Sequence, residues 1–167
     1  MRDVCKVLFL CRDNAALSIM AEALLRELGG PRFEAYSAGW EPAAQVDRMA
    51  LAELRPGISA THLLNPKSWH EFTGEWAPRL DVVVLCDRLH DRALPAFPGE
   101  PAICLWEVDT AFATMDDIAI RTRAVQRAFW QLLRRVDSFC SATPARAAIA
   151  ALGAVLSDTS RDLPATA

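Results

Sequence analysis

The sequence contains no long hydrophobic run, no excess of positive charge and no row of metal-ligand residues. None of its apolar stretches reaches the roughly 18–20 residues that a membrane-spanning helix needs, so we expect no membrane segment. The formal net charge is −3, which provides no electrostatic basis for binding nucleic acid or an anionic membrane surface. The three histidines are scattered without metal-ligand spacing, so we expect neither a metal ion nor another cofactor.

A signal peptide and a disulfide framework are also absent. Charged residues interrupt the first six positions and no small-residue cleavage site follows, which argues against secretion. In a chain without a secretion signal, an odd number of cysteines is better interpreted as free thiols, some of them reactive. We therefore expect a cytoplasmic protein. The five cysteines are Cys5, Cys11, Cys86, Cys104 and Cys140.

The pattern of apolar residues predicts strands that alternate with helices. Strands are expected at 4–10, 33–38, 81–87 and 102–106, and helices at 18–28, 44–54 and 68–72. A long helix, capped by Thr114 and with Asp116 and Asp117 in its first turn, is expected to bury an apolar stripe from Ile118 to Phe139. This alternation predicts an α/β domain with a four-stranded parallel sheet in a three-layer α/β/α arrangement. We expect the domain to occupy residues 1–142, and an Ala-rich helix with a frayed tail to follow at 143–167.

The most informative feature is the polar loop that follows the first strand. This loop, from Cys11 to Ser18, joins a buried strand to a helix N-terminus, where backbone N–H groups and the helix dipole favour an anion. We expect a lowered pKa at Cys11, an amide cross-link from Asn14, and a Ser18 hydroxyl that caps the helix or hydrogen-bonds to the thiolate. Cys86 and Cys104 also lie at or near strand ends, where parallel sheets place their working sites. The alternative is a buried structural cysteine before an ordinary turn.

Several segments match a known pattern in the right order. Residues 7–22 read V-L-F-L-C-R-D-N-A-A-L-S-I-M-A-E, where the pattern has V-L-F-x-C-x-x-N-S-A-R-S-x-M-A-E. The chain thereby resembles the low-molecular-weight phosphotyrosine phosphatase superfamily, and most closely its thioredoxin- or glutaredoxin-coupled arsenate reductases. The further matches are residues 36–39 with S-A-G, 65–72 with x-x-K-S-W-D-E-F, 82–87 with the third strand, 97–101 with W-P-G-x-P, and 106–109 with H-W-x-x-x-D-P.

The resemblance implies a cysteine nucleophile, a second thiol and a general acid. Cys11 matches the nucleophile, Cys86 the second thiol of the arsenate reductases, and Asp109 the aspartate that protonates the leaving oxygen in the phosphatases. The partners that it implies are a small oxyanion, arsenate or phosphate, or a phosphotyrosine-type ligand, with thioredoxin or glutaredoxin and glutathione as reductants. The anion-binding loop would comprise Arg12, Asp13, Asn14, Ala15, Ala16, Leu17 and Ser18.

Three chemical roles depart from the family pattern. Leu17 replaces the arginine of the C-x5-R-S loop, whose guanidinium holds the oxyanion through two charge-assisted hydrogen bonds. Arg12 lies beside the nucleophile on the wrong side of the loop and is expected to point to solvent, while Asp13 adds a negative charge that repels anions. Leu94 stands where a third thiol is expected, and Asp109 lacks the proline that follows it in the family.

These departures leave three hypotheses. The chain is an arsenate reductase or a protein-tyrosine phosphatase whose oxyanion chemistry is weakened or lost because of Leu17. It is otherwise a non-catalytic binding protein of the same fold. The third hypothesis is a thiol redox protein that pairs Cys11 with Cys86 or Cys104, although Cys104 is also interpretable as a small core residue.

Overall fold

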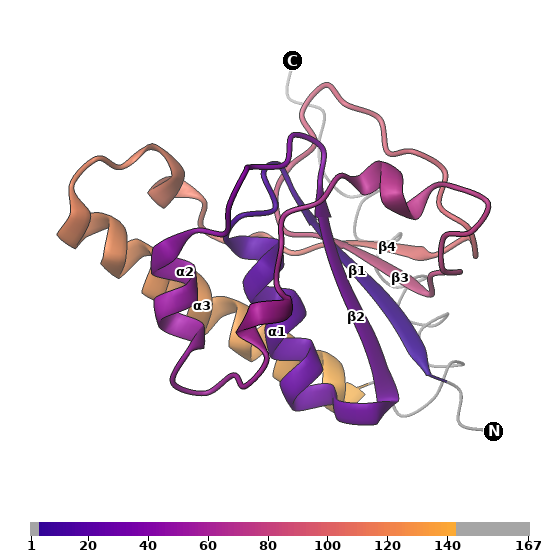
Figure 1. Ribbon diagram of the computed structural model, residues 1–167, viewed down its shortest axis with the longest axis horizontal. Coiled ribbons are helices and arrows are strands. Elements are labelled where there is room, and N and C mark those ends of the chain that lie inside the picture. Colours follow the sequence, from indigo (N-terminus) through magenta and orange to yellow (C-terminus); the bar gives the residue numbers. More distant parts are fainter. Residues whose placement is uncertain (1–3, 143–167) are drawn as a thin grey trace, which may run out of the picture.

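A computed structural model describes residues 4–142 and contains a parallel sheet of four strands, with helices packed along it (Figure 1). The strands are β1 (Cys5–Cys11), β2 (Phe33–Gly39), β3 (Val82–Leu85) and β4 (Ala102–Leu105), in the spatial order β2-β1-β3-β4. The predicted α/β class with a four-stranded parallel sheet is therefore confirmed. The helix expected after residue 142 lies outside the described residues.

The two faces of the sheet are covered differently. The helices α1 (Leu17–Gly29), α2 (Arg48–Leu54) and α3 (Ile118–Ala142) pack against one another over one face, where Phe9 and Val84 lie in the larger core cluster (Figure 1). The other face carries Leu8 and Leu10 and is covered by irregular segments and the 3₁₀ helix η3 (Trp69–Phe72), which Ser68 caps. The central strand β1 is thus buried on both faces, as its apolar run predicts.

Two helix starts differ from their predictions. The helix expected from residue 44 begins at Arg48, because the Asp47 carboxylate accepts hydrogen bonds from the first free N–H groups, those of Met49 and Ala50. The long helix is capped by Asp117, whose Oδ1 accepts a hydrogen bond from the Ile120 N–H at 2.9 Å.

Thr114 instead ends a separate 3₁₀ helix, η4 (Ala111–Thr114), so its predicted role as the cap of α3 is wrong. Asp116 and Asp117 accordingly precede the helix rather than lie in its first turn. Ile118 is the first residue of α3 and is 73% exposed, so the buried stripe of this helix begins further along the chain, at Ala124 and Val125.

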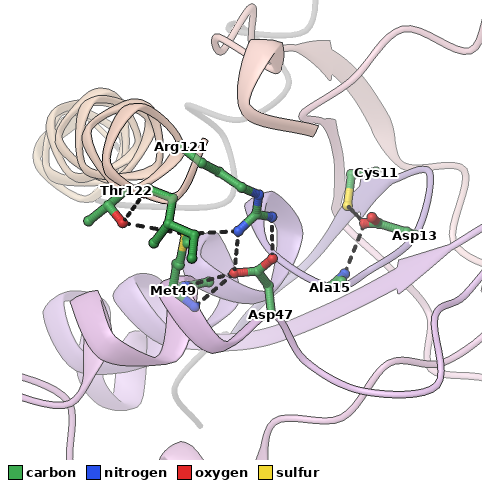
Figure 2. A network of polar contacts seen from close by, with 9 residues as sticks. Cys11, Asp13, Ala15, Asp47, Met49, Arg121 and Thr122 are labelled. Atoms are coloured by element: carbon green, nitrogen blue, oxygen red, sulfur yellow. Dashed lines mark hydrogen bonds and ion pairs between the residues drawn. The ribbon is translucent and has the colours of Figure 1, made fainter. Parts of the chain in front are cut away.

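A partly buried ion pair joins the helical layer to the loop that follows β1. The Arg121 guanidinium of α3 is paired with the Asp47 carboxylate and lies over the Phe112 ring of η4 (Figure 2). The Asp47 backbone N–H also donates to the Ala15 carbonyl at 2.8 Å. The loop is therefore held by α2 and, through Arg121, by α3. Within residues 4–142, no helix has the length and apolar character needed to cross a membrane.

Candidate functional site

The loop of residues 11–18 forms the floor of a cavity of about 840 Å³ at the carboxyl ends of the strands. The end of β2 passes so close to the loop that a Cβ atom on Gly39 would lie 2.6 Å from the Arg12 carbonyl oxygen. A residue with no side chain is therefore needed at position 39. The remaining walls come from Trp40 and Glu41, from residues 87 and 89–92 after β3, and from residues 110–114.

Cys11 is anchored by a chain of buried hydrogen bonds. Its Sγ lies 2.9 Å from Ser18 Oγ, and the Asn14 amide donates to Ser18 Oγ at 2.8 Å. The same amide nitrogen donates to Ser37 Oγ of β2 at 2.9 Å. Asn14 thus cross-links the loop as predicted, and Ser18 contacts the sulfur rather than capping α1, whose N-cap position is Ala16.

The chain of hydrogen bonds continues to a buried ion pair. Ser37 Oγ donates to Glu22 Oε2 at 2.5 Å, and Arg26 Nη2 lies 2.5 Å from the other carboxylate oxygen. Burial raises the pKa of Glu22, while Ser37, Lys67 and Arg26 act in the opposite direction. The hydrogen bonds and the nearby cations explain how a carboxylate can lie inside α1 with only 1% of Glu22 exposed.

The Asp13 carboxylate occupies part of the anion site of the loop itself. Its Oδ1 accepts a hydrogen bond from the Ala15 backbone N–H at 3.0 Å and one from the Cys11 thiol at 3.7 Å (Figure 2). A backbone N–H group that would be available to a bound oxyanion therefore already has a negatively charged partner. The loop can hold an anion, and in this structure it holds one of its own side chains.

The predicted lowering of the Cys11 pKa is wrong for this structure. Burial raises the pKa of the Cys11 thiol to about 11, the hydrogen bond from Ser18 lowers it, and the Asp13 carboxylate raises it further. Only 3% of Cys11 is exposed, so the charged form would lose most of its hydration. The backbone contacts of the loop also lower this pKa, but they are too weak to offset the burial.

Leu17 is both a core residue and a wall of the cavity. It is 4% exposed, belongs to the core cluster beneath the helices and also borders the cavity over Cys11. Arg12 points outward, with 68% of its side chain exposed, and its Nε lies 2.8 Å from Glu41 Oε2. Arg92 is paired with the other oxygen of Glu41. Both arginines at the cavity rim are therefore bound to one carboxylate.

The structure brings Cys86 close to Cys11 and leaves Cys104 in the core. Leu10 of β1 pairs with Leu85 of β3, so the next residue on each strand places Cys11 and Cys86 side by side. Cys104 pairs with Val84, two positions before Cys86, and is buried in the same core cluster. Burial raises the pKa of Cys86 and of Cys104.

Asp109 and Glu107 line a different cavity from the one over Cys11. This second cavity, of about 360 Å³, also borders Cys86. The Asp109 carboxylate accepts a hydrogen bond from the Ala111 N–H at 2.9 Å, which caps the turn into η4. Glu107 is paired with Arg88 at 2.5 Å. Among the described residues, no group of His, Cys, Asp or Glu is arranged to hold a metal ion.

The family profile of the low molecular weight phosphotyrosine protein phosphatase matches residues 6–103, which is more than half of the chain. The chain belongs to this phosphatase family. The matched residues include the loop after β1 and the strands β2 and β3. No match is found among curated proteins.

Solved structures of similar fold include several arsenate reductases and the protein Wzb of Vibrio vulnificus. An arsenate reductase from Archaeoglobus fulgidus DSM 4304 is 26% identical, with a TM-score of 0.63 over 81% of this chain and 98% of that chain. An arsenate reductase in the phosphate binding state is 23% identical, with a TM-score of 0.65 over 83% and 98% of the two chains. Vibrio vulnificus Wzb in complex with benzylphosphonate is 15% identical, with a TM-score of 0.64 over 82% and 97%.

The charged rim of the cavity in this phosphatase-family chain was not predicted from the sequence. Glu41, His90, Asp91 and Arg92 line the cavity, yet none of them lies in a motif that the sequence comparison singled out. One signal was available, because residues that follow a strand of a parallel sheet lie at the edge where sites form. Trp40 also lines the cavity, whereas Trp76 is 95% exposed and is not part of its lining.

We predict that Cys11 is alkylated slowly at neutral pH. With a thiol pKa of about 11, the reactive thiolate at pH 7.5 is about two orders of magnitude scarcer than for a free cysteine, whose pKa is about 8.5. The rate with iodoacetamide, followed by mass spectrometry of the Cys11 peptide, should rise about tenfold per pH unit well beyond pH 9. The reference is the same peptide in urea, where the rate should level off near the ordinary pKa. A plateau near neutral pH in the folded protein would contradict the prediction.

Proposed function

We propose that this chain is a phosphatase-family protein whose oxyanion chemistry at Cys11 is strongly reduced or lost, and that its cavity serves to bind a ligand. One observation carries the proposal. Where the family pattern has arginine, Leu17 is buried in the core, and the only negative charge held by the loop is that of Asp13. The small oxyanions suggested by the relatives, arsenate, phosphate or a phosphotyrosine-type group, are weak ligands of this chain.

The size of the loss follows from the missing hydrogen bonds. A guanidinium holds an oxyanion through two charge-assisted hydrogen bonds, each of which contributes about 1.5–3 kcal/mol. Their removal corresponds to a decrease of about 10²–10⁴-fold in affinity, and repulsion by Asp13 adds to it. An arginine that stabilises charge in the transition state also contributes to the rate. The cations at the rim do not compensate, because Arg12 and Arg92 are paired with Glu41.

Thiol redox chemistry is the second candidate, and the placement of two cysteines supports it. Cys11 and Cys86 follow paired positions on adjacent strands, which is the arrangement that a disulfide between them would use. The raised pKa of both thiols argues against fast exchange in the reduced protein. Thioredoxin or glutaredoxin with glutathione would be the reductants in that case, as for the thioredoxin- or glutaredoxin-coupled arsenate reductases that the sequence resembles.

A calorimetric titration of the reduced protein with phosphate and with arsenate tests the proposal, together with hydrolysis of an aryl phosphate. We expect no binding at submillimolar concentrations and no turnover that depends on Cys11. Cys11→Ser is the control, and its background rate should equal that of the native protein. Submillimolar binding, or turnover that disappears in Cys11→Ser, would contradict the proposal, because the backbone of the loop would then suffice without the arginine.

A further inference from the structure

We propose that the cavity over Cys11 binds an organic cation, through an ammonium or guanidinium group. The inference rests on the proposed loss of oxyanion chemistry and names the ligand class of the same site. The cavity has a volume of about 840 Å³, which lies in the range of small-molecule and side-chain pockets.

The walls of the cavity carry more negative than positive charge. Four carboxylates line it, those of Asp13, Glu41, Asp87 and Asp91, against the two guanidiniums of Arg12 and Arg92. The lining therefore has two net negative charges when His90 is neutral. A pocket with a net negative lining disfavours phosphate and favours a cation, because its low-dielectric walls concentrate the electric field of the charged side chains inside it.

The two arginines are not free to receive an anion. The Arg12 Nε lies 2.8 Å from one oxygen of Glu41, and Arg92 is paired with the other oxygen of the same carboxylate. An anion that bound them would have to displace Glu41 and approach the remaining carboxylates. Glu41 thus offsets one of the two positive charges at the rim.

Three carboxylates remain to face a ligand. Asp13 lies at the loop, and Asp87 and Asp91 lie in the segment after β3. Within residues 4–142, none of the three is in an ion pair. Asp13 and Asp87 each accept a hydrogen bond from a backbone N–H through one oxygen, Oδ1. Arg12 lies near enough to Asp13 and Asp87 for their charges to interact, so the three carboxylates exceed the remaining positive charge at the cavity by two.

The apolar part of the lining also fits a cation of this kind. Leu17 supplies a hydrocarbon surface at the position where the family has a positive charge, so the repulsion that would exclude a cation is absent. Trp40 and Phe112 provide aromatic walls. Aromatic surfaces bind guanidinium and ammonium groups favourably, and the methylene stem of such a side chain packs on apolar surface. The same chemistry occurs in a free organic cation and in an arginine or lysine side chain of a partner.

Calorimetric titration of the reduced full-length protein with Nα-acetyl-arginine amide tests the inference. The neutral urea isostere Nα-acetyl-citrulline amide and the anion phenylphosphonate are titrated beside it. We expect the cation to bind about tenfold or more tightly than the neutral isostere, with an affinity that falls as salt is added. A short arginine-containing peptide distinguishes the two sources, since only a protein partner predicts tighter binding of the peptide than of the amide.

Two double variants are compared, and each of them removes two negative charges. Asp87→Asn with Asp91→Asn should weaken binding of the arginine amide by about tenfold. Glu75→Gln with Asp137→Asn removes two charges from exposed positions outside the cavity and should leave the affinity unchanged. Equal binding of the cation and its neutral isostere, equal losses in the two double variants, or binding of phenylphosphonate alone would overturn the inference. Absence of binding by all three probes would also overturn it, whereas the proposed loss of oxyanion chemistry would stand.

Discussion

Replacing Leu17 with arginine is expected to raise the affinity of the loop for phosphate or arsenate by about 10²–10⁴-fold, because two charge-assisted hydrogen bonds are restored. Position 17 can accommodate an arginine, because Leu17 borders the cavity over Cys11 while its side chain packs on the core. An arginine there can extend its guanidinium into the cavity and leave its stem on the apolar side. The new charge should also lower the raised pKa of Cys11.

The measurement is a calorimetric titration of the native protein and the Leu17→Arg variant with the same anion. Leu17→Met is the matched control, because it keeps the volume and apolar character and should bind no better than the native protein. The substitution to arginine is expected to lower the free energy of unfolding by about 1–3 kcal/mol, so a cooperative unfolding transition must be recorded first.

A second variant separates the effect of the missing arginine at position 17 from the effect of the Asp13 carboxylate. Leu17→Arg with Asp13→Gly also frees the Ala15 N–H that Asp13 now occupies, and it should bind the anion more tightly than Leu17→Arg alone. If both variants fold and neither binds phosphate, the loop is not an anion site in this chain. The proposed loss of oxyanion chemistry would then stand, but Leu17 and Asp13 would not be its cause.

Asn14→Ala is expected to lower the free energy of unfolding by about 3–5 kcal/mol, which is a large part of the stability of a typical domain. The Asn14 side chain is fully buried and makes three hydrogen bonds, to Ser18, to Ser37 and from the Lys67 N–H. Removal of the amide takes the acceptor from the Lys67 N–H and a donor from each serine hydroxyl, which then keep only their contacts with Cys11 and Glu22. Asn14 also has a φ of 49°, where alanine is strained by about 1 kcal/mol or more.

Asn14→Gly isolates the strain from the hydrogen bonds. Glycine loses the same three contacts but accepts a positive φ, so it should be about 1 kcal/mol less destabilising than alanine. Urea unfolding of the three proteins, with the slope of the transition compared, provides both differences. Equal stabilities of the alanine and glycine variants would show that the loop does not adopt this backbone conformation in solution.

Much of the fold could be predicted because the apolar patterns are local. The run from Val7 to Leu10 is strand-like by itself, and three- and four-residue spacing from Ser18 to Leu28 specifies a helix. Helix starts were predicted less well, because a cap depends on which polar side chain meets the first N–H groups. Asp47 and Asp117 meet them here, and both residues were placed inside the predicted helices.

The candidate site was predicted in part. The position of Cys11 at a strand end and the cross-linking role of Asn14 follow from residue order, because a strand, a polar loop and a helix must succeed one another. The pKa of Cys11 did not follow, because it depends on burial and on the distance to Asp13. A sequence motif specifies which ionisable groups are present. Tertiary packing determines how far each group is exposed to water, and hence its pKa.

The sequence by itself determined the four parallel strands, the family and the replacement of the loop arginine by Leu17, since each is a matter of residue type and order. The tertiary structure decided the state of the site. It placed the Asp13 carboxylate on the Ala15 N–H, joined Arg12 and Arg92 to Glu41, and gathered a negative lining over Cys11. The Asp13 contact is local, whereas the Glu41 pairs and the cavity lining join segments far apart in the chain. Electrostatic interactions depend on distance and burial rather than on sequence position.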